Sequence, residues 1–167
     1  MPHELARLLA QTIATELPFL RAVTEPEASA TPSSAGAWSK KEELGHLIDS
    51  ATNNHLRFVK AALEGGYEGP PYAQDEWVRL HGYAEMPWAD LANLWFQYNV
   101  LLSRLVERIP EEHLAAECKI GYSAPVTLGF LIDDYVLHMQ HHVDHILSRA
   151  LVTAYPRTVP RPVPDPS

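Results

Sequence analysis

Apolar residues recur at helical spacing in four separate segments of this chain, and this periodicity constrains the fold more than any other feature. The predicted helices cover roughly residues 4–20, 39–63, 87–110 and 127–150. No segment gives a convincing strand pattern of alternating apolar and polar residues. Because amphipathic helices bury their apolar faces against one another, the sequence predicts an all-α protein, a four-helix bundle.

Short signals mark the helix ends and the connections. Ser39-Lys-Lys-Glu42 is a capping box, in which the serine oxygen accepts from a free backbone N–H and the glutamate reaches back. Gly65 and Gly66 are expected to stop this helix. The remaining segments are predicted as a loop (24–37), a long connection (65–86) and irregular chain with a short turn at residues 111–114 (110–126).

Length and charge narrow the class of protein. The 167 residues suit a single domain, predicted over residues 1–154, followed by a Pro-rich tail over residues 155–167. The net charge of −8 argues against a nucleic-acid partner, which needs a basic face. The chain has neither an apolar run of roughly 18 residues nor the pattern of a signal peptide, so we expect a cytoplasmic protein with no membrane partner. The single cysteine, Cys118, is expected to be a buried structural residue.

Nine histidines are present, and four of them crowd the last predicted helix: His138, His141, His142 and His145. His141 and His145 lie one turn apart on one helix face, a spacing with which two imidazoles can hold one metal ion. His138 and His142 form a second such pair, and spacing alone does not choose between them. A solvated or mutually hydrogen-bonded cluster is the alternative. The apolar surroundings favour a metal, because a buried polar group without a partner costs about 1–3 kcal/mol.

A polar stripe on the second predicted helix offers a third ligand. Glu42, His46, Asp49 and Asn53 follow one another at helical spacing, whereas the opposite side of this helix is apolar. Such a stripe faces either water or a functional site, and the residues alone leave both interpretations open.

Three short motifs, in order and at matching spacing, resemble those of the DinB/YfiT-like superfamily. They are Trp38-Ser-Lys-Lys-Glu42 with Leu44-Gly-His46-Leu-Ile-Asp49-Ser50, then Tyr72-Ala-Gln-Asp-Glu-Trp77, then His141-His-Val-Asp-His145-Ile146. The resemblance covers residues 38–150 and implies a four-helix bundle with a long crossover connection, often dimeric, that binds one divalent metal ion. It carries the ligand role onto His46, His141 and His145, and it makes His138 a neighbour of the site or a reserve ligand.

The resemblance also implies an activity. Members of the superfamily include thiol S-transferases that use bacillithiol or mycothiol, and a thiol-dependent isomerase. We therefore expect a thiol S-transferase whose partners are a small-molecule thiol and an electrophile. The alternatives are a metal-dependent hydrolase and a non-catalytic metal-binding dimer with a structural or sensing role. No side-chain nucleophile accompanies the motifs, so the reactive group is expected to be a metal-bound water or thiolate, because a bound ion lowers the pKa of either.

Further residues complete the predicted site. Asp49, Asn53 and His138 are candidates to hold the ligands through hydrogen bonds. Tyr72 and Trp77 lie in the long connection, where they either form a wall of the substrate pocket or pin the connection to the core. Nickel or zinc is the expected metal, with iron or manganese as alternatives. A homodimer is expected from the resemblance and from the apolar residues that surround the third and fourth helices.

Overall fold

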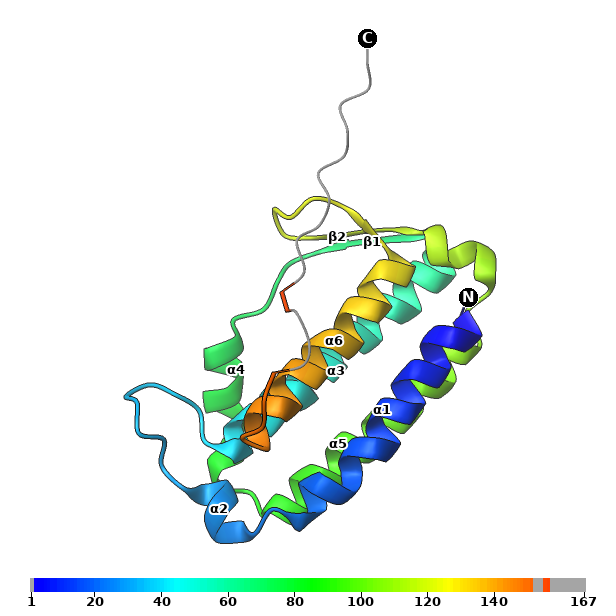
Figure 1. Ribbon diagram of the computed structural model, residues 1–167. Coiled ribbons are helices and arrows are strands. Elements are labelled where there is room, and N and C mark those ends of the chain that lie inside the picture. The colour runs from blue at the N-terminus through cyan, green and yellow to red at the C-terminus, as the bar shows by residue number, and fades with distance from the viewer. Residues whose placement is uncertain (1, 152–154, 157–167) are drawn as a thin grey trace.

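The computed structural model describes residues 2–151 and 155–156 and consists mainly of helices (Figure 1). Four long helices form a bundle: α1 (Pro2–Ala22), α3 (Lys40–Glu64), α5 (Trp88–Glu107) and α6 (Leu128–Ile146). α1 and α3 each pack against both α5 and α6, so the four helices enclose one core. The predicted all-α four-helix bundle is therefore confirmed.

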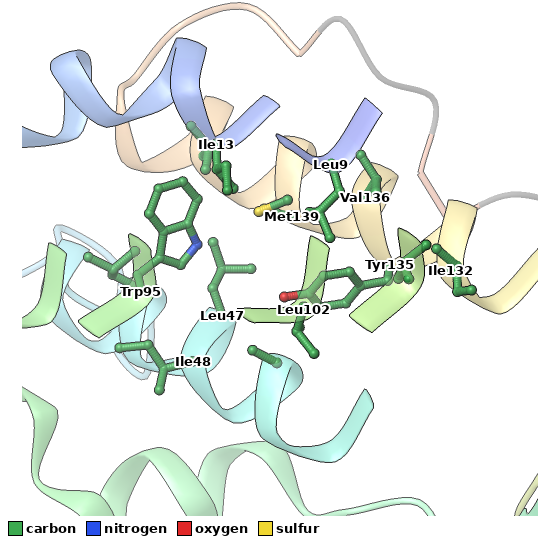
Figure 2. Close-up of a cluster of buried hydrophobic side chains, with 14 of the residues drawn as sticks. Leu9, Ile13, Leu47, Ile48, Trp95, Leu102, Ile132, Tyr135, Val136 and Met139 are labelled. Carbon is green, nitrogen blue, oxygen red and sulfur yellow. The ribbon is translucent and has the colours of Figure 1, made fainter. Parts of the chain in front are cut away.

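The core is built from the apolar faces of all four long helices (Figure 2). Leu9 and Ile13 come from α1, Leu47 from α3, Trp95 from α5 and Met139 from α6, and all five side chains are buried. Removing one such side chain from water contributes about 1.5–3 kcal/mol to folding. Burial of the apolar residues that recur at helical spacing therefore holds the four helices together.

The predicted helix caps explain where α3 and α6 begin. Ser39 Oγ accepts from the backbone N–H of Glu42, and the Glu42 carboxylate accepts from the backbone N–H of Ser39 at 2.8 Å. Thr127 Oγ1 accepts from the backbone N–H of Phe130 at 3.1 Å. α3 ends at Gly65, which adopts the left-handed conformation that favours glycine. α6 ends at Ile146, four residues before the predicted end.

The connection between α3 and α5 is a long crossover. It contains β1 (Gly66–Gly69), α4 (Gln74–His81) and the 3₁₀ turn η1 (Tyr83–Glu85). This connection returns along the side of the bundle, so α3 and α5 run in the same direction (Figure 1). Both α4 and η1 pack against α3, and this contact brings Tyr83 against the first turns of α3.

Short elements occur where the sequence predicted loops. The segment 24–37 contains α2 (Glu25–Ser29), and the predicted turn at residues 111–114 is the 3₁₀ turn η2 (Glu111–Ala115). β1 pairs in parallel with β2 (Glu117–Ile120), which pairs in antiparallel with β3 (Val126–Thr127). The expectation that the chain has no strands is therefore wrong. These strands have four residues or fewer, which is too short for an alternating pattern to stand out.

Two expectations concern the membrane and the C-terminal tail. Among the described residues, no helix is long and apolar enough to span a membrane. The predicted boundary between a domain of residues 1–154 and a tail of residues 155–167 falls mostly outside the described residues. It stays a prediction.

Candidate metal centre

Three histidines from two helices meet where α3 packs against α6. His46 lies on α3, and His138 and His142 lie one turn apart on α6. Nε2 of His46 is 3.0 Å from Nε2 of His138, and the ring centroids of His46 and His142 are 4.7 Å apart. One nitrogen from each of the three imidazoles lies within 4.8 Å of the other two. We refer to His46, His138 and His142 as the His46 cluster.

Burial keeps two of the three rings, His46 and His138, neutral. His46 is 1% exposed, and the ring of Trp38 lies against it with 4.8 Å between the centroids. Burial, with a smaller contribution from His142, lowers the pKa of His46 to about 3. Burial and the neighbouring histidines lower the pKa of His138 to about 2. Both imidazoles are therefore neutral at pH 7, and each carries a lone pair that can bind a metal ion.

Side chains around the cluster orient two of the three rings. Nδ1 of His142 lies 2.9 Å from a carboxylate oxygen of Glu43, and Nδ1 of His138 lies 3.4 Å from the hydroxyl of Ser50. A carboxylate on the outer nitrogen of a histidine favours the tautomer whose Nε2 lone pair is free for a metal ion. Nδ1 of His46 is buried and has no hydrogen-bond partner among the described residues.

The cluster fits a divalent metal ion. Two imidazole nitrogens that each lie about 2.0–2.1 Å from one ion are roughly 3–3.4 Å apart, and His46 and His138 are 3.0 Å apart. At this distance, either one ring donates its N–H to the other, or both lone pairs face one ion. Three neutral nitrogen donors suit first-row transition metals, whereas magnesium and calcium prefer oxygen ligands.

The predicted ligands His141 and His145 lie next to this cluster on α6. Their ring centroids are 5.1 Å apart, and Nδ1 of His145 lies 3.3 Å from Glu43. Within the described residues, side chains that could hold an ion form two groups: His46 with His138 and His142, and Glu43 with His142 and His145. The structure therefore brings His46 together with the pair His138 and His142. The set His46, His141 and His145 stays a prediction that metal analysis of single variants can decide.

Asp49 belongs to a network beside the cluster. Its Oδ1 accepts from the hydroxyl of Tyr83 at 2.7 Å and lies 3.0 Å from Nδ1 of His81. Burial raises the pKa of Asp49, although the contacts with Tyr83 and His81 act in the opposite direction. Gly45 makes room for this network, because a Cβ at residue 45 would overlap the Tyr83 ring. The network ties the crossover connection to the helix that carries His46.

The other residues predicted to support the ligands occupy different positions. Asn53 donates to the backbone oxygen of Asp49 at 2.9 Å, which is a contact within α3. Among the described residues, neither Asn53 nor Asp49 forms a hydrogen bond with a histidine of the His46 cluster. His138, predicted as a neighbour of the site or a reserve ligand, lies within the cluster.

A small cavity lies beside His138, and a larger cavity adjoins it. The smaller one, about 150 Å³, is lined by His138, Ser50 and Tyr72 among others. The larger one, about 640 Å³, also contacts Tyr72 and extends to Cys118. Trp77 lines neither cavity but packs against Tyr72, with 5.2 Å between the ring centroids. Tyr72 therefore forms part of the wall of both cavities, and Trp77 packs against its ring.

The sequence reasoning missed the polar residues that α3 buries toward these cavities. Ser50, Asn54 and Arg57 are buried and line the smaller cavity. They follow His46 at intervals of four, four and three residues, which is one face of a helix. Extending the helical spacing from His46 toward the end of α3 could have found them.

Comparisons with known proteins agree with this fold. The model of the DinB superfamily matches residues 8–146. A protein of Oceanobacillus iheyensis named "putative metal-dependent hydrolase" is 26% identical over 114 residues, which are 68% of this chain and 66% of that protein. A Bacillus cereus protein with the same descriptive name is 24% identical over 154 residues, which cover 89% of this chain and 78% of that protein.

Two solved structures share the fold. YfiT from Bacillus subtilis, described as "a probable metal-dependent hydrolase with an unusual four-helix bundle topology", has a TM-score of 0.77 at 20% identity, over 88% of this chain and 84% of YfiT. The mycothiol-dependent maleylpyruvate isomerase has a TM-score of 0.70 at 15% identity, over 86% of this chain but only 59% of the isomerase. Since the family model spans all four long helices and the His46 cluster, this chain belongs to the DinB superfamily.

Proposed function

We propose that this protein is a metal-dependent enzyme that transfers a low-molecular-weight thiol to a small electrophile. In this proposal, His46, His138 and His142 hold one divalent ion, with nickel or zinc the expected metal. The observation that carries the proposal is the 3.0 Å approach of two buried, neutral imidazoles beside a cavity. The relatives named as metal-dependent hydrolases support the metal, and the mycothiol-dependent neighbour supports the thiol.

The chain's own residues prepare the site for this chemistry. Glu43 orients His142, and Ser50 lies against the outer nitrogen of His138. Trp38 covers His46 and keeps water away from its ring. A divalent ion on three neutral imidazoles keeps its positive charge and open positions, and it lowers the pKa of a thiol or water that binds it.

The carboxylates beside the cluster do not decide between thiol transfer and hydrolysis. Glu43 contacts His142, and Asp49 accepts from Tyr83. A bound ion would lower the pKa of a thiol and of a water alike, so neither reaction requires a further base to form its nucleophile. Thiol transfer is the first candidate because a structural neighbour is mycothiol-dependent. Hydrolysis is the second candidate, because the sequence relatives carry that description.

A direct assay separates these functions. Metal-loaded protein is mixed with mycothiol or bacillithiol and 1-chloro-2,4-dinitrobenzene. In this reaction the sulfur–carbon bond forms, the carbon–chlorine bond breaks, chloride leaves and the thiol proton passes to the buffer. Para-nitrophenyl acetate tests ester hydrolysis in parallel. The matched variants are His46→Ala, in the cluster, and His3→Ala, exposed on α1.

Each outcome assigns a function. Conjugation that His46→Ala abolishes and His3→Ala retains supports thiol transfer. Ester cleavage with the same dependence, without conjugation, moves the assignment to a hydrolase. If neither reaction occurs although the metal is bound, the thiol-transfer proposal fails and a non-catalytic metal-binding role takes its place.

A further inference from the structure

One face of α3 carries a row of buried polar side chains. His46, Ser50, Asn54 and Arg57 are 1%, 4%, 8% and 7% exposed, respectively. At a rise of about 1.5 Å per residue, Arg57 lies roughly 16 Å along the helix from His46 on the same face. The row therefore begins at the His46 cluster and ends in a buried cation.

Arg57 forms no ion pair with a carboxylate among the described residues, although Asp134 lines the same two cavities. Its one hydrogen bond there goes from Nη1 to Oδ1 of Asn54, at 3.4 Å. A guanidinium has five N–H donors and remains protonated in proteins. A buried charge with so few partners is unfavourable unless something else satisfies it.

Arg57 lines both the small cavity beside His138 and the larger cavity that adjoins it. The cavities of about 640 Å³ and 150 Å³ share Arg57, Tyr72, Asp134 and Tyr155 in their linings, so they adjoin. The larger cavity is within the size range of small-molecule sites. Its remaining wall is largely apolar, with side chains such as Ile120, Val126, Phe130 and Leu131.

Among the described residues that line the larger cavity, Arg57 is the one cation. Burial raises the pKa of the Cys118 thiol, although Arg57 acts to lower it. Burial and the charge of Asp49 raise the pKa of Tyr72 to about 12, and Arg57 again acts in the opposite direction. Both groups are neutral at pH 7. Asp134 lines both cavities and contributes a negative charge, which disfavours a second anionic group on a ligand.

We propose that Arg57 binds the carboxylate of a small, largely apolar monocarboxylate in the larger cavity. The guanidinium fork matches a carboxylate through two parallel hydrogen bonds, and the apolar wall covers the rest of the ligand. Binding of this ligand does not depend on the proposed function. Only its role as the substrate of thiol transfer would rest on that function. The ligand's other end then lies toward His138 through the smaller cavity.

Calorimetric titration of the metal-loaded full chain tests this inference. The probes are 4-methylbenzoate, its neutral analogue 4-methylbenzamide, and the dianion terephthalate. The native chain should bind 4-methylbenzoate at least tenfold more tightly than either of the others. Arg57→Gln should remove this preference while the metal content stays unchanged, and Arg57→Lys should retain part of it. Arg104→Gln, which changes an exposed arginine on α5, is the control and should behave like the native chain.

Three results would overturn the inference. The first is equal affinity of the native chain for the carboxylate and the amide. The second is an Arg57→Gln variant that keeps the carboxylate preference, particularly if His138→Ala loses it, because the carboxylate would then bind the metal. The third is tighter binding of terephthalate. The thiol-transfer assay is separate, so Arg57-dependent binding without any conjugation would refute the proposed function and leave this binding site standing.

Discussion

Nε2 of His46 lies 3.0 Å from Nε2 of His138, a residue 92 positions later in the chain. The two nitrogens join α3 to α6, the helices that also line the cavities beside the cluster. Neither ring is protonated at neutral pH, since burial lowers the pKa of both. The pair can therefore accept a cation between the helices, which would couple metal binding to helix packing.

Metal analysis of single variants should separate the two possible ligand sets. His46→Ala, His138→Ala and His142→Ala should each lose most of the bound metal, because two imidazoles make a much poorer site than three. His141→Ala and His145→Ala should keep close to one ion per chain. Elemental analysis gives the metal content, and circular dichroism checks the fold. Full metal in His138→Ala, with loss in His141→Ala, would restore the set His46, His141 and His145.

Removing the metal should lower the thermal stability of the protein. An ion that binds only the folded chain adds about 2.7 kcal/mol when its free concentration is 100 times its dissociation constant. For a domain of this size, that corresponds to a melting temperature higher by roughly 5–10 °C. Thermal unfolding with and without a chelator measures the difference. A His46→Ala variant, as the control, should show no such difference, and equal melting temperatures for the native chain would contradict metal coupling.

The bundle could be predicted from the sequence because its helices are long and strongly periodic. The starts of α3 and α6 were also predicted correctly, from the capping residues Ser39, Glu42 and Thr127. Capping can be recognised in a sequence because it depends on neighbouring residues alone. The strands β1, β2 and β3 could not be predicted in this way. β1 pairs with β2 across about 50 residues, as in Tyr67 with Cys118, and each of the three strands is too short to carry a pattern of its own.

The ligand pair on α6 is harder to predict, because the two candidate pairs lie close together on the helix. His138 and His141 are three residues apart, which places them only about 60° apart around the axis. Both pairs therefore lie on one broad face, and the packing of α3 decides which pair meets His46. Arg57 is also hard to predict, because in the sequence it resembles an ordinary surface residue. Its place in the cavity walls becomes apparent only in the structure.

Replacing Gly45 should destabilise the fold through Tyr83. The new Cβ of Gly45→Ala would overlap the Tyr83 ring, so η1 would have to move away from α3. Overpacking of this kind costs about 1–3 kcal/mol. Gly129→Ala is the matched control, since a Cβ there meets only ordinary contacts at 3.5 Å and beyond. Urea unfolding should show a lower free energy of unfolding for Gly45→Ala and an unchanged one for Gly129→Ala. Equal effects of the two substitutions would contradict the role of Tyr83.

Asp49 should make stability depend on pH in the mildly acidic range. Burial raises the pKa of Asp49 in the folded chain above its usual value of 3.8, so the folded state keeps this proton longer than the unfolded state. The contribution of Asp49 to stability is therefore present below about pH 4 and declines as the pH rises through the raised pKa. In chelator, Asp49→Asn should gain stability relative to the native chain as the pH rises from 4 to 6. Parallel profiles for the two proteins would contradict this origin of the pH dependence.

The predicted homodimer has a candidate interface on α3 and α5. Leu56 and Leu63 on α3 are 54% and 81% exposed, and Leu94 and Leu101 on α5 are 44% and 47% exposed. Each pair is seven residues apart, so each forms a stripe along its helix, and the two helices are neighbours. Burying such leucines against a second copy would remove them from water and contribute to association.

Light scattering at micromolar concentration should therefore give twice the chain mass of 18.7 kDa. Leu94→Glu combined with Leu101→Glu should shift the mass to that of one chain, because two buried charges on each side disfavour association. Leu80→Glu changes another exposed leucine, on α4, and should leave the mass unchanged. A native mass of one chain would refute the dimer, and a dimer that persists in the double variant would place the interface on another face of the bundle.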